Sequence, residues 1–161
     1  MTNRVIVLSV LITLIMISAC VAENTGEKAI ENNEGKIAWF TNLEEAQVVA
    51  QEKDLPIFIH FTGSDWCGWC FKLEGEVYSK AIFQEYVAEN WVMVTLDFPK
   101  KIKQTAETVA YNRELATRFA IPGFPTVQLL ESDGTPIAQT GYQKGGAEQY
   151  IEHLKDLLAK K

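Results

Sequence analysis

The chain has 161 residues, of which 47% are apolar and 22% are charged, and its formal net charge is −6. This composition is typical of one globular domain, and it excludes both a disordered chain and a chain embedded in a membrane throughout. The acidic balance argues against nucleic acid as a partner, because binding to a phosphate backbone requires clustered cations.

The first residues have the composition of an export signal. Arg4 precedes an apolar run over 5–17 that only Ser9 and Thr13 interrupt, and small residues follow it. The run is shorter than the ~20 residues that span a bilayer, although an uncleaved anchor extending to Ala22 is geometrically conceivable. We therefore predict that the chain is exported.

The end of this run, Ile-Ser-Ala-Cys over 17–20, resembles a bacterial lipobox. Cleavage at such a motif would leave Cys20 as a lipid-carrying N-terminus. The competing interpretation is signal-peptidase cleavage after Ala22. The lipobox accounts for the odd total of three cysteines, because it leaves one pair. We predict a signal peptide with lipobox over 1–20 and a lipid anchor on the periplasmic side of a bacterial membrane.

Residues 21–35 are polar, acidic and poor in large apolar side chains, which predicts a flexible tether. A single domain is expected over 36–161. It begins with a short strand at 36–40, after which Thr41 and Glu44 have the spacing of a capping box for a helix that stops before the proline at 56.

The central part of the chain alternates buried strands with helices. Residues 56–62 form a run of β-branched and aromatic side chains that predicts a buried strand. A turn at 63–65 leads to Cys67 and Cys70, where a helix is expected to begin and to kink at Gly75. The later elements are a helix that continues or restarts over 79–90, a strand at 91–98, a polar stretch at 99–112, a helix at 113–121, a hairpin at 126–142 and a last helix from 145.

The resulting order, β-α-β-α-β-α-β-β-α, predicts an α/β fold. A parallel first half followed by an antiparallel hairpin gives a mixed central β-sheet, flanked by helices on both faces in three α/β/α layers.

The C-x-x-C spacing supports two chemistries, zinc binding and thiol redox exchange. A structural zinc site needs four ligands, but no fourth cysteine exists and the only histidines, His60 and His153, lie far apart in the chain. A metal shared between two molecules and a pair of inert core cysteines are the alternatives. The redox interpretation fits the local pattern better, because a helix start stabilises the thiolate of Cys67 and places Cys70 one turn behind it. No cofactor is expected beyond this pair.

Three motifs carry a family resemblance. They are "PIFIHFTGSDWCGWC" over 56–70, "LDF" over 96–98 and "IPGFPT" over 121–126, and with the hairpin and terminal helix they resemble the thioredoxin superfamily across 36–161. Within it, "GSDWCGWC", "LDFP", the polar insert and "GFPT…GY…GG" are most similar to the small exported disulfide reductases of the chlamydial DsbH type. The resemblance implies a thioredoxin fold and a redox-active dithiol.

The resemblance also implies roles for supporting residues. Pro125 would be a cis-proline against the disulfide, with the backbone of Phe124 binding a substrate chain; the alternative is a trans proline that opens an edge strand. His60 falls where thioredoxins often hold a buried acid beneath the second cysteine. It would accept a proton from Cys70, or serve only as a core histidine.

The tryptophans beside the cysteines are further candidates. Trp66 is expected to pack over the site and shield Cys70, and Trp69 is expected to be exposed and to touch substrate. Three lysines either rim the site or form a solvated loop: Lys100, Lys101 and Lys103.

We thus predict an exported, monomeric thiol-disulfide oxidoreductase that reduces or isomerises protein disulfides. Its partners would be protein or peptide disulfides, an upstream membrane or periplasmic thiol donor, and the membrane that holds its lipid. The direction of electron flow depends on a reduction potential that the motif does not reveal. The alternatives are a thioredoxin-fold module that binds Cu(I) through Cys67 and Cys70, and a redox-silent interaction domain.

Overall fold

The computed structural model describes residues 37–160, so the expected signal peptide, Cys20 and the tether lie outside the described residues. Within 37–160, no helix is both long enough and apolar enough to cross a membrane. The elements in chain order are β1 (Trp39–Phe40), α2 (Leu43–Lys53), β2 (Ile57–Thr62), α3 (Gly68–Leu73), the π-helix η1 (Glu74–Tyr78), α4 (Ala81–Asn90), β3 (Val92–Asp97), α5 (Ala106–Arg118), β4 (Thr126–Leu130), β5 (Pro136–Thr140) and α6 (Gly146–Leu158).

The five strands form one mixed sheet in the order β1-β3-β2-β4-β5. The first three strands run parallel to one another, whereas β4 pairs antiparallel with β2, and β5 pairs antiparallel with β4. In the register, Thr62 lies opposite Asp97, and Phe61 lies opposite Thr126. The C-terminal ends of β2 and β3 and the start of β4 therefore meet at one edge of the sheet. The predicted mixed sheet is confirmed.

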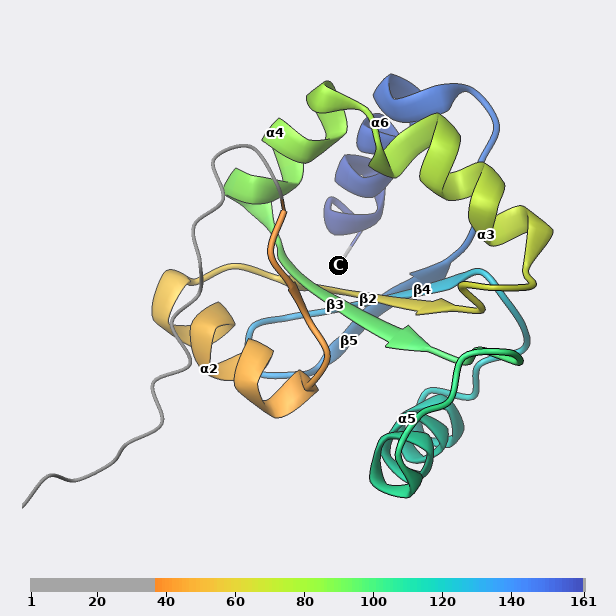
Figure 1. The fold of residues 1–161 in the computed structure, drawn as a ribbon. Coiled ribbons are helices and arrows are strands. Elements are labelled where there is room, and N and C mark those ends of the chain that lie inside the picture. The colour runs from red at the N-terminus through yellow and green to blue at the C-terminus, as the bar shows by residue number, and fades with distance from the viewer. Residues whose placement is uncertain (1–36, 161) are drawn as a thin grey trace, which may run out of the picture. The chain divides into compact units, whose positions relative to one another are not determined.

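Helices cover both faces of the sheet, which confirms the three-layer arrangement (Figure 1). The core on the side of α3, η1, α4 and α6 includes Phe58, whereas its strand neighbours Ile57 and Ile59 belong to the core on the side of α2 and α5. Side chains of a strand alternate between faces, so His60 lies on the same side as Phe58. Both faces of β2 are buried.

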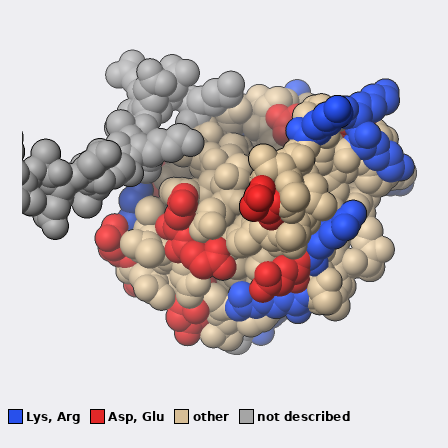
Figure 2. All heavy atoms as spheres, turned by 60° about the horizontal axis from the view of Figure 1, so that its bottom comes forward, with Lys and Arg blue, Asp and Glu red and all other residues tan. Residues whose placement is uncertain are grey.

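The face that α2 and α5 cover is shown in Figure 2. Acidic side chains and neutral surface alternate there, and the largest group of Lys and Arg lies toward one end. On the part of this face that the described residues form, no continuous basic surface offers a track for a phosphate backbone.

Two helix starts differ from the expected ones. The cap of α2 is Asn42 instead of Thr41, because the Asn42 side chain accepts a hydrogen bond from the N–H of Glu45 at 2.8 Å. Helix α5 begins at Ala106, well before the expected 113, and Thr105 caps it. Most side chains in the early turns of α5 face solvent. Their sequence therefore lacks the apolar periodicity that predicts a helix.

The irregularity expected at Gly75 takes the form of the π-helix η1. The N–H of Ser79 donates to the carbonyl oxygen of Glu74 at 2.9 Å, which closes the wider turn, and α4 restarts after Lys80. Such π-bulges are frequent at functional sites. Here the bulge directly follows the helix that begins at the two cysteines.

Candidate active site

Cys67 and Cys70 are joined by a disulfide, with their Cα atoms 5.2 Å apart. Cys67 is the N-cap of α3, and its Sγ accepts the N–H of Cys70 at 3.2 Å. Both residues are buried, with exposed fractions of 5% and 3%. Since backbone N–H groups at a helix start favour negative charge, this position stabilises a thiolate on Cys67 once the disulfide is reduced.

The loop before the disulfide folds tightly against Trp66. The N–H of Cys67 donates to the carbonyl oxygen of Gly63 at 2.9 Å. A Cβ atom at Gly63 would lie only 2.5 Å from the indole ring of Trp66. Glycine is therefore required at this position for the tryptophan to pack across the turn.

Two aspartates fasten this loop to the end of β3. The carboxylate of Asp97 accepts the backbone N–H of Ser64 at 2.8 Å and its hydroxyl at 2.5 Å. Asp65 accepts three backbone N–H groups, and these bonds, that of Lys100 first, hold the pKa of the Asp65 carboxyl below its usual value. The three donors are Lys100, Lys101 and Ile102, at 2.9, 2.6 and 3.0 Å.

The Phe124–Pro125 peptide bond is cis, as the resemblance implied. Pro125 directly precedes β4, whose first residue lies opposite Phe61, so the proline flanks the end of the strand that leads to the disulfide. The Phe124 ring meets the Trp66 ring edge to face, with centroids 5.8 Å apart.

Trp66 and Lys100 lie together at the rim of the site. The indole N–H of Trp66 donates to the carbonyl oxygen of Phe98 at 2.7 Å, and Nζ of Lys100 lies 3.9 Å from the indole centroid. One of the three predicted lysines therefore packs on the loop before the cysteines. That Trp66 shields Cys70 stays a prediction.

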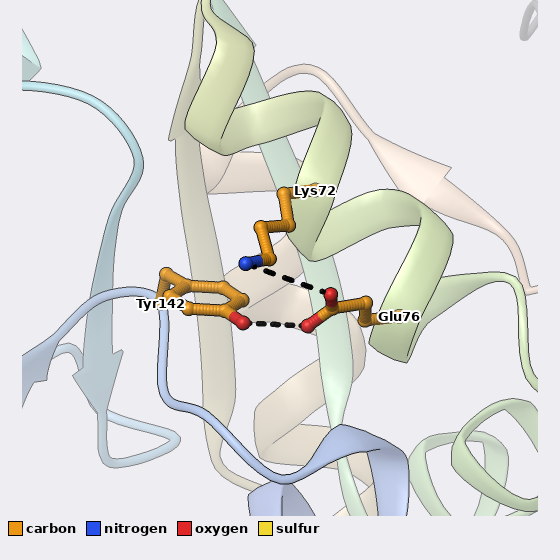
Figure 3. A network of polar contacts seen from close by, with 3 residues as sticks. All are labelled: Lys72, Glu76 and Tyr142. Atoms are coloured by element: carbon orange, nitrogen blue, oxygen red, sulfur yellow. Dashed lines mark hydrogen bonds and ion pairs between the residues drawn. The ribbon is translucent and has the colours of Figure 1, made fainter.

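Trp69 is 56% exposed, as expected for a residue that meets substrate. Its ring lies 5.3 Å from that of Tyr142, and Nζ of Lys72 is 5.2 and 5.1 Å from the two ring centroids. Glu76 accepts the hydroxyl of Tyr142 at 2.5 Å and pairs with Lys72 at 3.7 Å (Figure 3). The hydrogen bond to Glu76 raises the pKa of Tyr142. The loop between β5 and α6, which carries Tyr142, is thus held against α3 although it is distant in sequence.

A cleft of about 360 Å³ opens beside Cys70. His60 lies in this cleft as a buried residue, with an exposed fraction of 6%, and its ring meets the edge of Tyr78 at a centroid distance of 5.0 Å. Burial lowers the pKa of His60 to about 3, so the imidazole is neutral at neutral pH. The side chains that line the cleft with Cys70 and His60 are Trp39, Thr62, Ser64, Phe71, Glu74, Tyr78 and Thr95.

His60 therefore lies near Cys70, as the resemblance implied, but it carries no charge there. Its Nε2 has no hydrogen-bond partner among the residues that the structure describes. Within the same range, no group of three or more His, Cys, Asp or Glu side chains is placed to hold a metal ion.

Residues 43–158 match the family described as thioredoxin-like domain. The chain belongs to this family. It is similar to the disulfide bond reductase DsbH of Chlamydia pneumoniae, with 32% identity over 114 residues, which are 71% of this chain and 69% of that one. It is also 30% identical over 117 residues to the thioredoxin-related protein DsbJ of Chlamydia pneumoniae, covering 73% of this chain but only 34% of that one.

A solved structure described as a DsbH oxidoreductase has the same fold. It superposes with a TM-score of 0.73 and 30% identity over 78% of this chain and 87% of its own. The predicted thioredoxin fold and the resemblance to the DsbH type are confirmed. With the Cys67–Cys70 disulfide in place, this member of the thioredoxin-like family is a thiol-disulfide oxidoreductase.

Sequence reasoning missed several parts of the site. Asp65 appeared only as a turn residue, and Tyr142 appeared only in the motif "GY", although each anchors a loop at the cysteines. Glu74 was also missed. It could have been found from its position four residues after Cys70, because that spacing places both residues on one face of a helix.

Proposed function

We propose that the protein reduces or isomerises disulfides of exported proteins, with Cys67 as the attacking sulfur and Cys70 as the resolving one. The observation that carries this assignment is the position of Cys67 at the N-cap of α3, where Sγ accepts a backbone N–H. The Cys67 thiolate attacks one sulfur of the substrate disulfide, and the other leaves as a thiolate. Cys70 then attacks Sγ of Cys67, which releases the second substrate sulfur and forms the Cys67–Cys70 disulfide.

An upstream thiol donor in the membrane or periplasm would return two electrons to this disulfide. The reductive direction is supported by the similarity to a protein described as a disulfide bond reductase. A reduction potential near −270 mV would agree with it, whereas a value near −120 mV would make the pair a strong oxidant.

Cys67→Ser is expected to abolish the reduction of insulin disulfides. The assay uses the full chain carrying Cys20→Ser, so that the site holds its only thiols, with dithiothreitol as the electron source. Because serine cannot form the mixed disulfide, the rate should fall to that of dithiothreitol alone. A Cys67→Ser protein that still turns over would contradict the assignment.

The substrate chain is proposed to lie along Pro125 and the backbone of Phe124, with its flanking side chains against Trp69. An exposed indole offers a large apolar surface next to the reacting sulfurs. Trp69→Ala should raise KM for insulin several-fold with little change in kcat. Ile82→Ala, which removes another exposed apolar side chain, on α4, should leave both unchanged. Equal KM values for the two variants would contradict the contact.

The site is proposed to act on the periplasmic side of a bacterial membrane, held by lipid on Cys20. The apolar run and lipobox of the sequence support this, as does the similarity to chlamydial Dsb proteins. In a Gram-negative host, Cys20→Ser should move the protein from the membrane fraction or prevent its maturation, and labelling with a radioactive fatty acid should be lost. Labelling that persists in Cys20→Ser would exclude this anchor.

A further inference from the structure

The cleft beside Cys70 contains one acidic side chain, Glu74. Its N–H donates to the carbonyl oxygen of Cys70, so the two residues are one helical turn apart on the same face of α3 and its continuation η1. Both side chains line the cleft, and Glu74 lies at its solvent-exposed edge. The cleft volume of about 360 Å³ exceeds the space that a water molecule occupies several times over.

The resolving step needs a base at this position. Cys70 must lose its proton before it attacks Sγ of Cys67, and an ordinary thiol, with a pKa of about 8.5, is mostly protonated at neutral pH. Cys70 is also buried, which disfavours its thiolate further. A general base has to lie within hydrogen-bond reach of the thiol, directly or through one water molecule.

His60 is poorly suited to hold that proton. Its pKa of about 3 lies far below that of a thiol, so the equilibrium would leave the proton on Cys70 by a factor of about 10⁵. By contrast, partial burial of the Glu74 carboxyl group raises its pKa above the usual value, which makes it a stronger base than an ordinary glutamate. The residue is nevertheless exposed enough to exchange protons with solvent.

We propose that Glu74 is the general base of the resolving step, directly or through one water molecule in the cleft. This inference rests on the proposed roles of Cys67 and Cys70. The Cys70 S–H proton passes to the Glu74 carboxylate, the Cys70 thiolate attacks Sγ of Cys67, and the bond between Cys67 and the substrate sulfur breaks. The substrate leaves as a thiolate, and Glu74 returns the proton to solvent.

The other titratable groups that line the cleft do not act as the base. His60 is neutral, and its Nε2, which has no hydrogen-bond partner among the described residues, is available to position a water molecule between Cys70 and Glu74. Tyr78 is buried, and burial raises the pKa of its hydroxyl well above the ordinary value, which excludes it as a base. On the same helical segment, Glu76 and Lys72 are engaged with Tyr142 on the Trp69 side of the helix.

The test is a stopped-flow reaction of the reduced full chain, carrying Cys20→Ser, with 5,5′-dithiobis(2-nitrobenzoate). Attack by Cys67 releases one thionitrobenzoate, and resolution by Cys70 releases the second. In Glu74→Gln, the second phase should slow by about 10- to 100-fold at pH 7, since general bases typically contribute 10²–10⁴-fold and water replaces part of the loss. Glu85→Gln, an exposed carboxylate on α4, is the matched control and should behave as the wild type.

Two further readouts separate a base from a merely structural residue. The second phase of Glu74→Gln should rise about tenfold per pH unit up to the thiol pKa, whereas that of the wild type should level off once Glu74 is ionised. Acetate should accelerate the second phase of Glu74→Gln but not that of Glu85→Gln, and Glu74→Asp should recover part of the rate.

An unchanged second phase in Glu74→Gln overturns the inference. So does a slowed phase whose pH profile parallels the wild type and does not respond to acetate. If the wild type itself never releases the second thionitrobenzoate, the proposed roles of the cysteines fail instead. Should Glu74→Gln not fold, Glu74→Asp and the pH profile of the wild type carry the same test.

Discussion

Replacing Cys70 by alanine is expected to leave Cys67 covalently bound to its substrate and to reduce turnover of protein disulfides by at least about three orders of magnitude. Cys70 is disulfide-bonded to Cys67, and the one other cysteine of the sequence is Cys20, which lies outside the described residues. Without an internal thiol, release of the substrate depends on an external thiol that must reach Cys67, a residue with an exposed fraction of only 5%.

The measurement is the fraction of protein that runs as a mixed disulfide on a non-reducing gel after the reduced protein is exposed to insulin with intact disulfides. Cys70→Ala should accumulate this adduct, and mass spectrometry should place it on Cys67. The wild type and Cys67→Ser should both lack it, the first because it resolves and the second because it never attacks. Release of substrate from Cys70→Ala at the wild-type rate would show that Cys70 is not the resolving sulfur.

A strand or helix could be predicted from the sequence wherever its residues formed one clear pattern. The run of β-branched and aromatic residues in β2 predicted a buried strand, and all six of its residues are buried; the hairpin predicted over 126–142 is formed by β4 and β5. Helix α5 was placed too late because its first turns are solvated. The cap of α2 was misplaced by one residue because Thr41 and Asn42 are both good caps, and only the hydrogen bond to Glu45 decides between them.

The reactive pair was predictable because its spacing and the helix start lie within a few residues of one another. The residues that hold it are distant in sequence: Asp65 binds amides 35 to 37 positions away, and Tyr142 binds Glu76 across 66 positions. A single sequence gives no signal for such pairs, because each residue alone reads as a turn or a surface side chain. Glu74 was missed although its signal is local, since a spacing of four residues on a helix puts it on the same face as Cys70.

The free energy of unfolding should decrease as the pH is lowered from 6.5 to 3, and His60 is expected to account for part of this decrease. The pKa of this buried imidazole is about 3 in the folded protein, against 6.5 for an ordinary histidine, so the unfolded chain binds the extra proton throughout this window. Protonation therefore favours unfolding, and the free energy of unfolding decreases as the pH falls below 6.5 and is unaffected by this group above it. At pH 5 the loss from His60 is about 2 kcal/mol relative to pH 7.5.

His60→Leu removes this titration and keeps an apolar side chain of similar size in the core. Urea unfolding at several pH values should show a shallower decline for His60→Leu than for the wild type, with the difference reaching about 2 kcal/mol at pH 5. His153→Gln is the matched control, because His153 is only partly buried and bonds to Thr140, and its curve should parallel the wild type. Parallel curves for His60→Leu and the wild type would mean that the folded protein protonates His60 at its ordinary pKa. The imidazole could then hold the proton of Cys70, and Glu74 would lose its advantage as the base.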